Sequence, residues 1–297
     1  MGTRRYRRSS TVLALALIIG RAGAAADVDR VPRDGTPDSP RIVSLSPHIT
    51  ELLFAAGAGA RVVGIDDASD YPEAARRLPR VGEPGALDVE KLLMLAPTRV
   101  IVWGGGTSQG QLAELERLNL HPYVTEQRHL DDIGTALIEF GRLAGTQRVA
   151  DESARRYALD LAALRARYAG RARLTVFYQV WDRPLYTLSG AHPLSEVLRL
   201  CGGENVFADL GPLAPEVDRE AVLERDPEVI LIGADGAEGA RQVRDWARFT
   251  SLRAVAHAAV FTVDPSLLGR MTPRILEGAR QVCERLDAAR TAVHGAH

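Results

Sequence analysis

One phrase of helix and strand is written twice in this chain, 130 residues apart. Residues 88–102 read DVEKLLMLAPTRVIV, and residues 218–232 read DREAVLERDPEVILI. Each copy begins with Asp, has Glu at its third position and has Pro shortly before an aliphatic run. A repeat with one copy in each half of the chain predicts two halves that are built on the same plan.

The segments around the repeat alternate between strand and helix patterns. In the first half we expect strands at 41–46, 61–65, 99–103 and 121–125, and helices that start at Ser46-Pro47, near Tyr71-Pro72, at Asp88, at Ser108 and at Leu130. In the second half we expect strands at 174–180, 229–232 and 258–263, and helices at 193–200, from Asp218, at 237–248 and at 273–288. This alternation predicts the α/β class, with two α/β lobes that contain parallel-type sheets.

A long helix is expected between the lobes, from about Gln147 to Tyr168. Apolar residues recur along one of its faces at steps of three and four, namely Ala150, Ala154, Tyr157, Leu161, Leu164 and Tyr168. A helix of this length spans about 33 Å, which is a domain's width, so it can join two lobes. The predicted organisation is a signal peptide at 1–26, a disordered leader at 27–40, an N-terminal lobe at 41–145, a linking helix at 146–169 and a C-terminal lobe at 170–290.

The N-terminal segment has the pattern of an export signal. Arg4, Arg5, Arg7 and Arg8 precede a short apolar core, and Ala24-Ala25-Ala26 offers small residues for cleavage. An uncleaved membrane anchor is the alternative. The whole chain has a net charge of −1, and removal of the five arginines of residues 1–26 leaves −6. This charge gives no indication of a nucleic-acid partner, and the signal predicts an exported protein.

Two cysteines, Cys201 and Cys283, are the only ones in the chain. In an exported protein an even number of cysteines favours a disulfide, and two separate buried thiols are the alternative. The spacing matches no zinc motif.

Glu90 and Glu220 occupy the same place in the two copies of the repeat. One interpretation is local, because acidic side chains in the first turn stabilise the positive end of a helix dipole. The other is that two matched carboxylates meet arginine clusters on a symmetric partner.

The chain from Arg41 to Arg285 resembles the periplasmic cobalamin-binding proteins of vitamin B12 ABC importers. This resemblance lies within the wider superfamily that binds iron siderophores, haem and cobalamin. The matching stretches are RIVSLSPHITELLFAAG, SDYP at 69–72, VIVWGGG at 100–106, VLRLCGGENVF at 197–207, PEVDREAVL at 215–223 and TPRILEGARQVCERL at 272–286. The resemblance implies a class III periplasmic binding protein, in which one rigid helix joins two lobes and the ligand is held between them.

The resemblance also assigns roles to individual residues. It implies a disulfide between Cys201 and Cys283, and docking of Glu90 and Glu220 on arginines of a dimeric permease in the inner membrane. It implies a ligand site with Tyr71, Trp103, Tyr186 and Arg270. Gly104 is added to this site because a glycine lets the backbone approach a ligand closely. The protein would act as a monomer, cobalamin would be its transported ligand and not a cofactor, and it would not be an enzyme.

Three positions depart from the family pattern. Pro84 and Ala214 stand where the family has tryptophans, and Ser266 stands where it has an aspartate, although Asp264 is nearby. Lost indoles reduce the apolar surface that a ligand can bury, and Trp181 is a candidate to replace it.

The chemistry of the site fits a flat macrocycle edged with amides. Trp103 ends a predicted strand just before Gly104, and open α/β sheets bind ligands at the carboxyl ends of their strands; a core aromatic is the alternative. His48, His121, His129, His192 and His257 are scattered in the sequence and are interpreted as surface or capping residues, so no protein metal site is predicted. His48 or Tyr71 as a ligand to iron keeps haem or a ferric siderophore as the alternative cargo. No catalytic motif supports the third hypothesis, an exported cleft enzyme.

Overall fold

The computed structural model describes residues 39–83 and 86–294, and these belong to one compact unit. The predicted signal peptide at 1–26, nearly all of the predicted leader at 27–40, and Pro84 lie outside the described residues. None of the helices formed by the described part of the chain is long and apolar enough to cross a bilayer.

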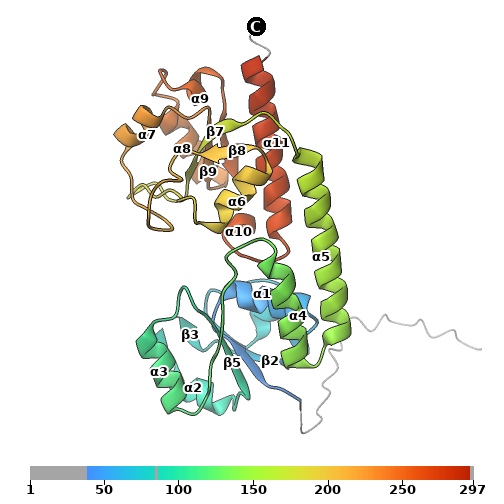
Figure 1. Cartoon of the computed structure of the whole chain (residues 1–297). Helices are drawn as coiled ribbons and strands as arrows, with labels where there is room; N and C mark the ends of the chain where they lie inside the picture. Colours follow the sequence, from blue (N-terminus) through green and yellow to red (C-terminus); the bar gives the residue numbers. More distant parts are fainter. Residues whose placement is uncertain (1–38, 84–85, 295–297) are drawn as a thin grey trace, which may run out of the picture. The chain divides into compact units, whose positions relative to one another are not determined.

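The first half of the described chain is an α/β unit around a parallel sheet (Figure 1). Its elements are, in chain order, β1 (Ile42–Ser44), α1 (Pro47–Ala55), η1 (Gly59–Arg61), β2 (Val62–Ile65), η2 (Glu73–Arg77), β3 (Gly82–Glu83), β4 (Ala86–Leu87), α2 (Val89–Met94), β5 (Arg99–Trp103), α3 (Gln109–Arg117), β6 (Tyr123–Thr125) and α4 (Asp132–Ala144). The four main strands pair in parallel in the order β2-β1-β5-β6. The connection after β1 leads to one edge of the sheet, and the connection after β5 leads to the other. A topological switch point therefore lies between β1 and β5.

The second half repeats this plan. Its elements are β7 (Leu174–Gln179), α6 (Pro193–Leu200), β8 (Gly203–Asn205), α7 (Arg219–Arg225), β9 (Val229–Gly233), α8 (Gly236–Trp246), α9 (Arg253–Ala256), β10 (Val260–Val263), α10 (Pro265–Leu268) and α11 (Ile275–His294). The strands again pair in parallel, in the order β10-β9-β7-β8, with the switch point between β7 and β9. The predicted α/β class with two parallel sheets is confirmed.

The two copies of the repeat form equivalent elements, α2 with β5 and α7 with β9. Asp88 caps α2 by accepting a hydrogen bond from the Lys91 amide at 2.9 Å, and Asp218 caps α7 by accepting one from the Ala221 amide at 2.7 Å. Both strands are buried along their aliphatic residues, as expected for a parallel sheet that is covered on both faces. Local capping thus explains the repeated Asp in full.

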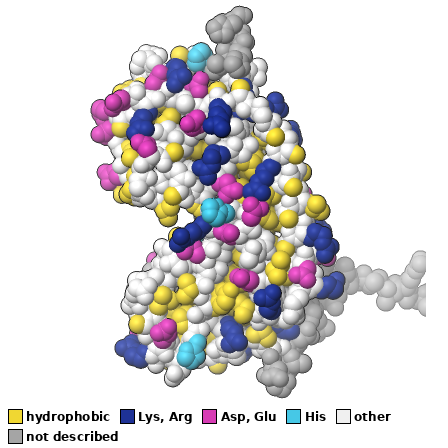
Figure 2. All heavy atoms as spheres, in the orientation of Figure 1, with side chains coloured by type: hydrophobic (Ala, Val, Ile, Leu, Met, Phe, Trp, Pro, Cys, Tyr) yellow, Lys and Arg dark blue, Asp and Glu magenta, His cyan; other side chains and the backbone are white. Residues whose placement is uncertain are grey.

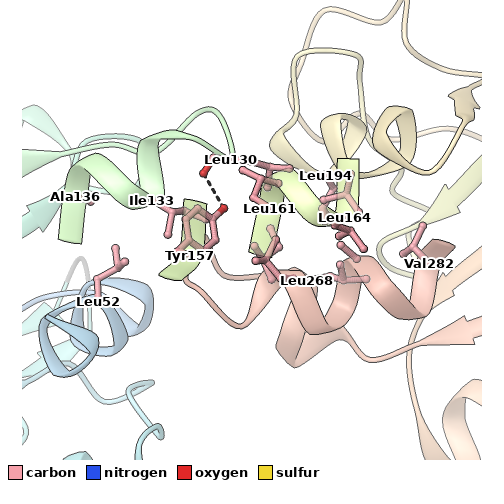
Figure 3. Close-up of a cluster of buried hydrophobic side chains, with 14 of the residues drawn as sticks. Leu52, Leu130, Ile133, Ala136, Tyr157, Leu161, Leu164, Leu194, Leu268 and Val282 are labelled. Carbon is pink, nitrogen blue, oxygen red and sulfur yellow. Dashed lines mark hydrogen bonds between the residues drawn. The ribbon is translucent and has the colours of Figure 1, made fainter. Parts of the chain in front are cut away.

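The long helix α5 (Gln147–Tyr168) has the predicted bounds and joins the two halves (Figure 1). All six residues of its predicted apolar face are buried. Figure 3 shows Tyr157 and Leu161 beside Leu130 and Ile133, while Leu164 lies nearer to Leu194 and Val282. The Tyr157 hydroxyl donates a hydrogen bond of 2.7 Å to the Leu130 carbonyl.

The core is continuous from one half to the other through this helix. A single cluster of buried apolar side chains includes Ile42 and Leu52 of the first half, Leu161 of α5, and Leu231 and Val282 of the second half. Two smaller clusters lie in the separate halves, one around Val100 and one around Trp246. The halves therefore share buried surface, and the predicted domain boundaries at 145 and 170 stay predictions.

Several predicted elements differ from the structure in their details. The segment after Tyr71-Pro72 is a short 3-10 helix, η2, and the strand expected from His121 begins at Tyr123 because His121 has a φ of 40°. The last helix begins at Ile275 and continues to His294, beyond the predicted end. No sequence pattern predicts β8, a strand of three residues that directly follows the turn at Gly202.

Candidate ligand site between the two sheets

A cavity of about 830 Å³ lies where the two halves face each other. Figure 2 shows the surface hollowed at this level, with hydrophobic, basic and histidine side chains around the hollow. The residues that line it are Ser46, Pro47, His48, Trp103, Glu126, Gln127, Arg128, His129, Ala191, His192, Pro193, Leu194, Leu213, Ala214, Leu268, Gly269 and Met271. Each half supplies part of this wall, so the site exists only in the assembled fold.

The first half contributes the loops that follow three adjacent strands. His48 follows β1, Trp103 ends β5, and residues 126–129 follow β6. These are the carboxyl ends of parallel strands on either side of the switch point, which is the position where open α/β sheets bind ligands. The predicted position of the ligand site therefore agrees with the topology.

Trp103 is 39% exposed, although it is one of the largest apolar side chains in the chain. Its indole packs edge-on against the His48 imidazole, with ring centres 5.5 Å apart. A Cβ on Gly105 would lie 2.9 Å from the indole, and one on Gly106 would also collide with it. The glycine run therefore leaves room for the Trp103 ring. Gly104 itself donates a hydrogen bond to the Thr125 carbonyl at 3.0 Å.

The second half contributes the start of α6 and two loops. His192 and Pro193 begin α6, Leu213 and Ala214 precede α7, and Gly269 and Met271 follow α10. Ala214, where the resemblance expects tryptophan, lies in the cavity wall. The small methyl group leaves open space that an indole would fill, so this departure bears directly on the shape of the site.

Four of the predicted ligand residues are not among the residues that line this cavity. Gly104 adjoins Trp103, and Arg270 lies between Gly269 and Met271. Tyr71 is 44% exposed, and its ring is covered by the Arg274 guanidinium at 4.1 Å from the ring centre. Tyr186 is half-buried and pairs through its backbone with Trp181 and Glu216. The roles of these residues in binding stay predictions.

The Arg270 guanidinium is engaged by acidic side chains of the other half. Its Nη1 donates to Glu51 Oε1 at 2.8 Å and to Asp70 Oδ1 at 2.6 Å. Glu51, which is 3% exposed, also accepts from the Thr272 hydroxyl at 3.0 Å and from Arg274 Nη1 at 3.4 Å. These contacts hold the two halves together beside the cavity. Glu51 was not among the predicted site residues, although a charged residue inside the apolar helix ITELLFAAG was a signal for it.

Three histidines that are scattered in the sequence line the same cavity: His48, His129 and His192. His48, which follows the first strand, reaches the cavity, and the capping residue His192 and the mostly exposed His129 line it as well. Burial lowers the pKa of His48 to about 4, with the Arg270 charge adding to the effect, and burial alone lowers the pKa of His192 to about 4. Both imidazoles are neutral at neutral pH. Among the described residues, no group of three or more His, Cys, Asp or Glu side chains could hold a metal ion by itself.

A buried amide in the wall lacks one partner. Gln127 is 6% exposed, and its Nε2 donates to the Thr125 hydroxyl at 2.7 Å. Its Oε1 has no hydrogen-bond partner in the described structure. Because an unsatisfied buried polar atom costs about 1–3 kcal/mol, such a group at a cavity wall suits a ligand that brings a polar partner.

A protein-family model described as "Periplasmic binding protein" matches residues 42–267. The chain belongs to the periplasmic binding protein family. Members of this family and the relatives named below are substrate-binding proteins, which agrees with a binding site and gives no support to the enzyme hypothesis.

Two curated relatives cover most of this periplasmic binding protein. The vitamin B12-binding protein of Vibrio cholerae is 35% identical over 249 residues, which cover 84% of this chain and 90% of the relative. The vitamin B12-binding protein of Yersinia pestis is 34% identical over 257 residues, which cover 86% of this chain and 90% of the relative. The predicted resemblance is confirmed.

Solved structures agree with the class III periplasmic binding protein fold. The periplasmic vitamin B12-binding protein BtuF of Vibrio cholerae superposes with a TM-score of 0.78 at 34% identity, covering 85% of this chain and 98% of that one. The periplasmic haem-binding protein BhuT in complex with two haems superposes with a TM-score of 0.75 at 23% identity, covering 84% and 99%, and shows the shared fold alone.

The disulfide between Cys201 and Cys283 is present in the structure, which confirms the predicted pairing. It joins the end of α6 to the middle of α11. Both cysteines are fully buried, and no free cysteine remains among the described residues.

Proposed function

We propose that this protein captures a corrinoid, namely cobalamin, in the cavity between its two halves and delivers it in the periplasm to an ABC permease of the inner membrane. The observation that carries the proposal is the cavity of about 830 Å³ at the switch point of the first sheet, in a chain that is 35% identical to a vitamin B12-binding protein. A largely apolar wall with a few polar groups is what a large ring edged with amides requires.

The charges of the wall favour a corrinoid over haem. Haem brings two carboxylates, which need cationic partners. Among the described residues of the wall, Arg128 is already paired with Glu126 at 2.9 Å, and the adjacent Arg270 is paired with Glu51 and Asp70. Neutral imidazoles and the Gln127 amide instead match the hydrogen bonds of neutral carboxamides.

Cyanocobalamin added to the purified protein in a calorimeter is expected to bind, and haem is expected not to compete with it.

Trp103→Ala should weaken cyanocobalamin binding by about 1–3 kcal/mol, which is the contribution of an aromatic surface that a ligand covers. Trp181, the candidate to replace the lost indoles, is 63% exposed and does not line the cavity, so Trp181→Ala is the matched control. Binding of haem without cyanocobalamin would point to the alternative cargo, and an unchanged affinity would remove Trp103 from the site.

The positions of Glu90 and Glu220 support docking on a two-fold permease. Both side chains are exposed in the first turns of α2 and α7. Each helix leads directly into a parallel strand, so it runs back along the sheet and its first turn lies near the carboxyl ends of the strands. Figure 1 shows α2 and α7 on the side of the halves away from α5. Two like charges at matched positions support docking on two equivalent basic sites.

Glu90→Ala combined with Glu220→Ala is expected to weaken association with the permease by roughly tenfold, the combined scale of two surface ion pairs. Corrinoid affinity should stay at the wild-type value, since neither residue lines the cavity. Uptake measured in cells that carry the matching permease, together with binding measured by calorimetry, separates the two effects. The control replaces Glu83 and Glu224 with alanine, because both are exposed acids outside those first turns. An unchanged uptake rate in the double variant would contradict the docking role.

Release is proposed to need only a small movement of the halves. The shared core through α5 and the contacts of Glu51 with Arg270 and Thr272 oppose a wide opening. Bending α5 itself would break backbone hydrogen bonds.

A further inference from the structure

Two neutral histidines of the cavity wall use their ring nitrogens differently. In His192, the Leu194 amide donates to Nδ1 at 3.1 Å. Because a neutral imidazole has one donor and one acceptor nitrogen, the proton of His192 is on Nε2. His192 therefore offers the ligand an N–H donor and no lone pair.

His48 has the opposite capacity. Its Nδ1 is 2.7 Å from the Ser46 hydroxyl oxygen, which has no other hydrogen bond in the described structure. When Nδ1–H donates to this oxygen, the lone pair on Nε2 is free, and Nε2 has no protein partner among the described residues. Metal-bound histidines use this arrangement, in which the second ring nitrogen donates to an oxygen that fixes the ring.

Trp103 holds the His48 ring in place from the second side. The two rings meet edge to face at an interplanar angle of 87°. The ring is thus positioned by Ser46 on its own loop and by the indole at the end of β5, so little side-chain freedom is left to lose when a ligand binds.

We propose that His48 Nε2 coordinates the cobalt of a bound corrinoid that has an exchangeable axial position. The inference rests on the proposed function, which supplies a ligand with cobalt at its centre. With a Co(III) corrinoid that carries water, the Nε2 lone pair forms a Co–N bond and one water molecule leaves with its own electron pair. The oxidation state of cobalt does not change, and no proton is transferred to the ligand.

The other donors of the wall are less suited to this role. Glu126 is paired with Arg128, and the ring of His129 is mostly exposed and lies 3.8 Å from Glu196. Met271 offers a thioether, which is a softer and weaker donor for cobalt than imidazole. His192 has its lone pair engaged by Leu194, as described above.

The test uses cobinamide, a corrinoid without the nucleotide base, in its Co(II) form. Its unpaired electron points along the axis of the ring, so one axial nitrogen splits each cobalt line of the electron paramagnetic resonance spectrum into a triplet. Bound to the full-length mature protein, Co(II)-cobinamide is expected to show this triplet. Protein labelled on histidine with the heavy nitrogen isotope should convert it into a doublet.

Variants assign the nitrogen. His48→Gln is expected to lose the triplet, whereas His192→Asn, which keeps a capping oxygen for the Leu194 amide, and Met271→Leu are expected to retain it. Thermal unfolding of each variant shows whether it is folded. A wild-type complex without nitrogen splitting, no binding of Co(II)-cobinamide, or a triplet that survives in folded His48→Gln would overturn the inference.

Cyanocobalamin distinguishes failure of this inference from failure of the proposed function, because both of its axial positions are filled. If cyanocobalamin binds and Co(II)-cobinamide shows no protein nitrogen, coordination by His48 is wrong and the transport proposal stands. If neither corrinoid binds, the proposed function is wrong as well.

Discussion

Replacing Glu51 with alanine is expected to lower the free energy of unfolding by about 3–5 kcal/mol, the scale of removing one partner of a buried ion pair. Glu51 is 3% exposed and accepts hydrogen bonds from Arg270, Thr272 and Arg274, all from the other half of the chain. Without the carboxylate, Arg270 and Arg274 lose a shared counter-charge at a site where water replaces it poorly. Urea denaturation gives the free energy directly.

A matched control separates the effect of losing a buried carboxylate from the effect of losing a carboxylate charge. Glu73→Ala removes an ion pair with Arg76 at 3.1 Å in which both side chains are more than half exposed, and it should change stability by less than about 1 kcal/mol. A loss of that small size in Glu51→Ala would contradict the role assigned to Glu51.

A double-mutant cycle tests whether the effect comes from the contact across the two halves. Arg270→Ala should cost less in the Glu51→Ala background than in the wild type, because the contact between the two side chains is already absent. Additive effects would mean that the two residues act independently. Since Gly269 and Met271 line the cavity on both sides of Arg270, the same ion pair also fixes part of the ligand site.

Removal of the disulfide is the second large effect. Cys201→Ala with Cys283→Ala is expected to lower the free energy of unfolding by about 4 kcal/mol, because the bond closes a loop with a sequence separation of 82. The loss of entropy in the unfolded chain is the main contribution, and the two fully buried positions add a small packing loss. Alanine is preferred to serine, whose hydroxyl would be buried without a designed partner.

The measurement compares urea denaturation of the double variant, of each single variant, and of wild type under reducing conditions. Reduced wild type and the double variant should have similar midpoints, since both lack the cross-link. A double variant as stable as oxidised wild type would show that the covalent bond is dispensable for stability.

Sequence patterns predicted most of the secondary structure, because helices and strands depend mainly on residues that are close together in the chain. The bounds of α5 and α6 and of β5 agree with the predictions residue by residue, since apolar periodicity, proline at a first turn and aliphatic strand runs are properties of neighbouring residues. β8 was missed because a strand of three residues after a turn owes its structure to pairing with β7.

The candidate site could be predicted only in part. Trp103 was placed correctly at the carboxyl end of a strand, where a general rule about parallel sheets applies. Gln127, His129 and Leu213 lie in loops that have no pattern of their own, and their contribution to one wall depends on how the two halves face each other. Arg270 was expected at the ligand, and the structure shows its guanidinium held by Glu51 and Asp70.

By itself, the sequence determined two α/β halves on one plan, the long helix between them and the matched positions of Glu90 and Glu220. These features follow from periodicity and repetition, which can be recognised in the sequence without knowing how the halves are arranged. Only the tertiary structure decided that His48 and His192 share a cavity and that Glu51 joins the halves. Those facts depend on contacts between residues more than a hundred positions apart in the chain, and such contacts exist only after the core around α5 has packed.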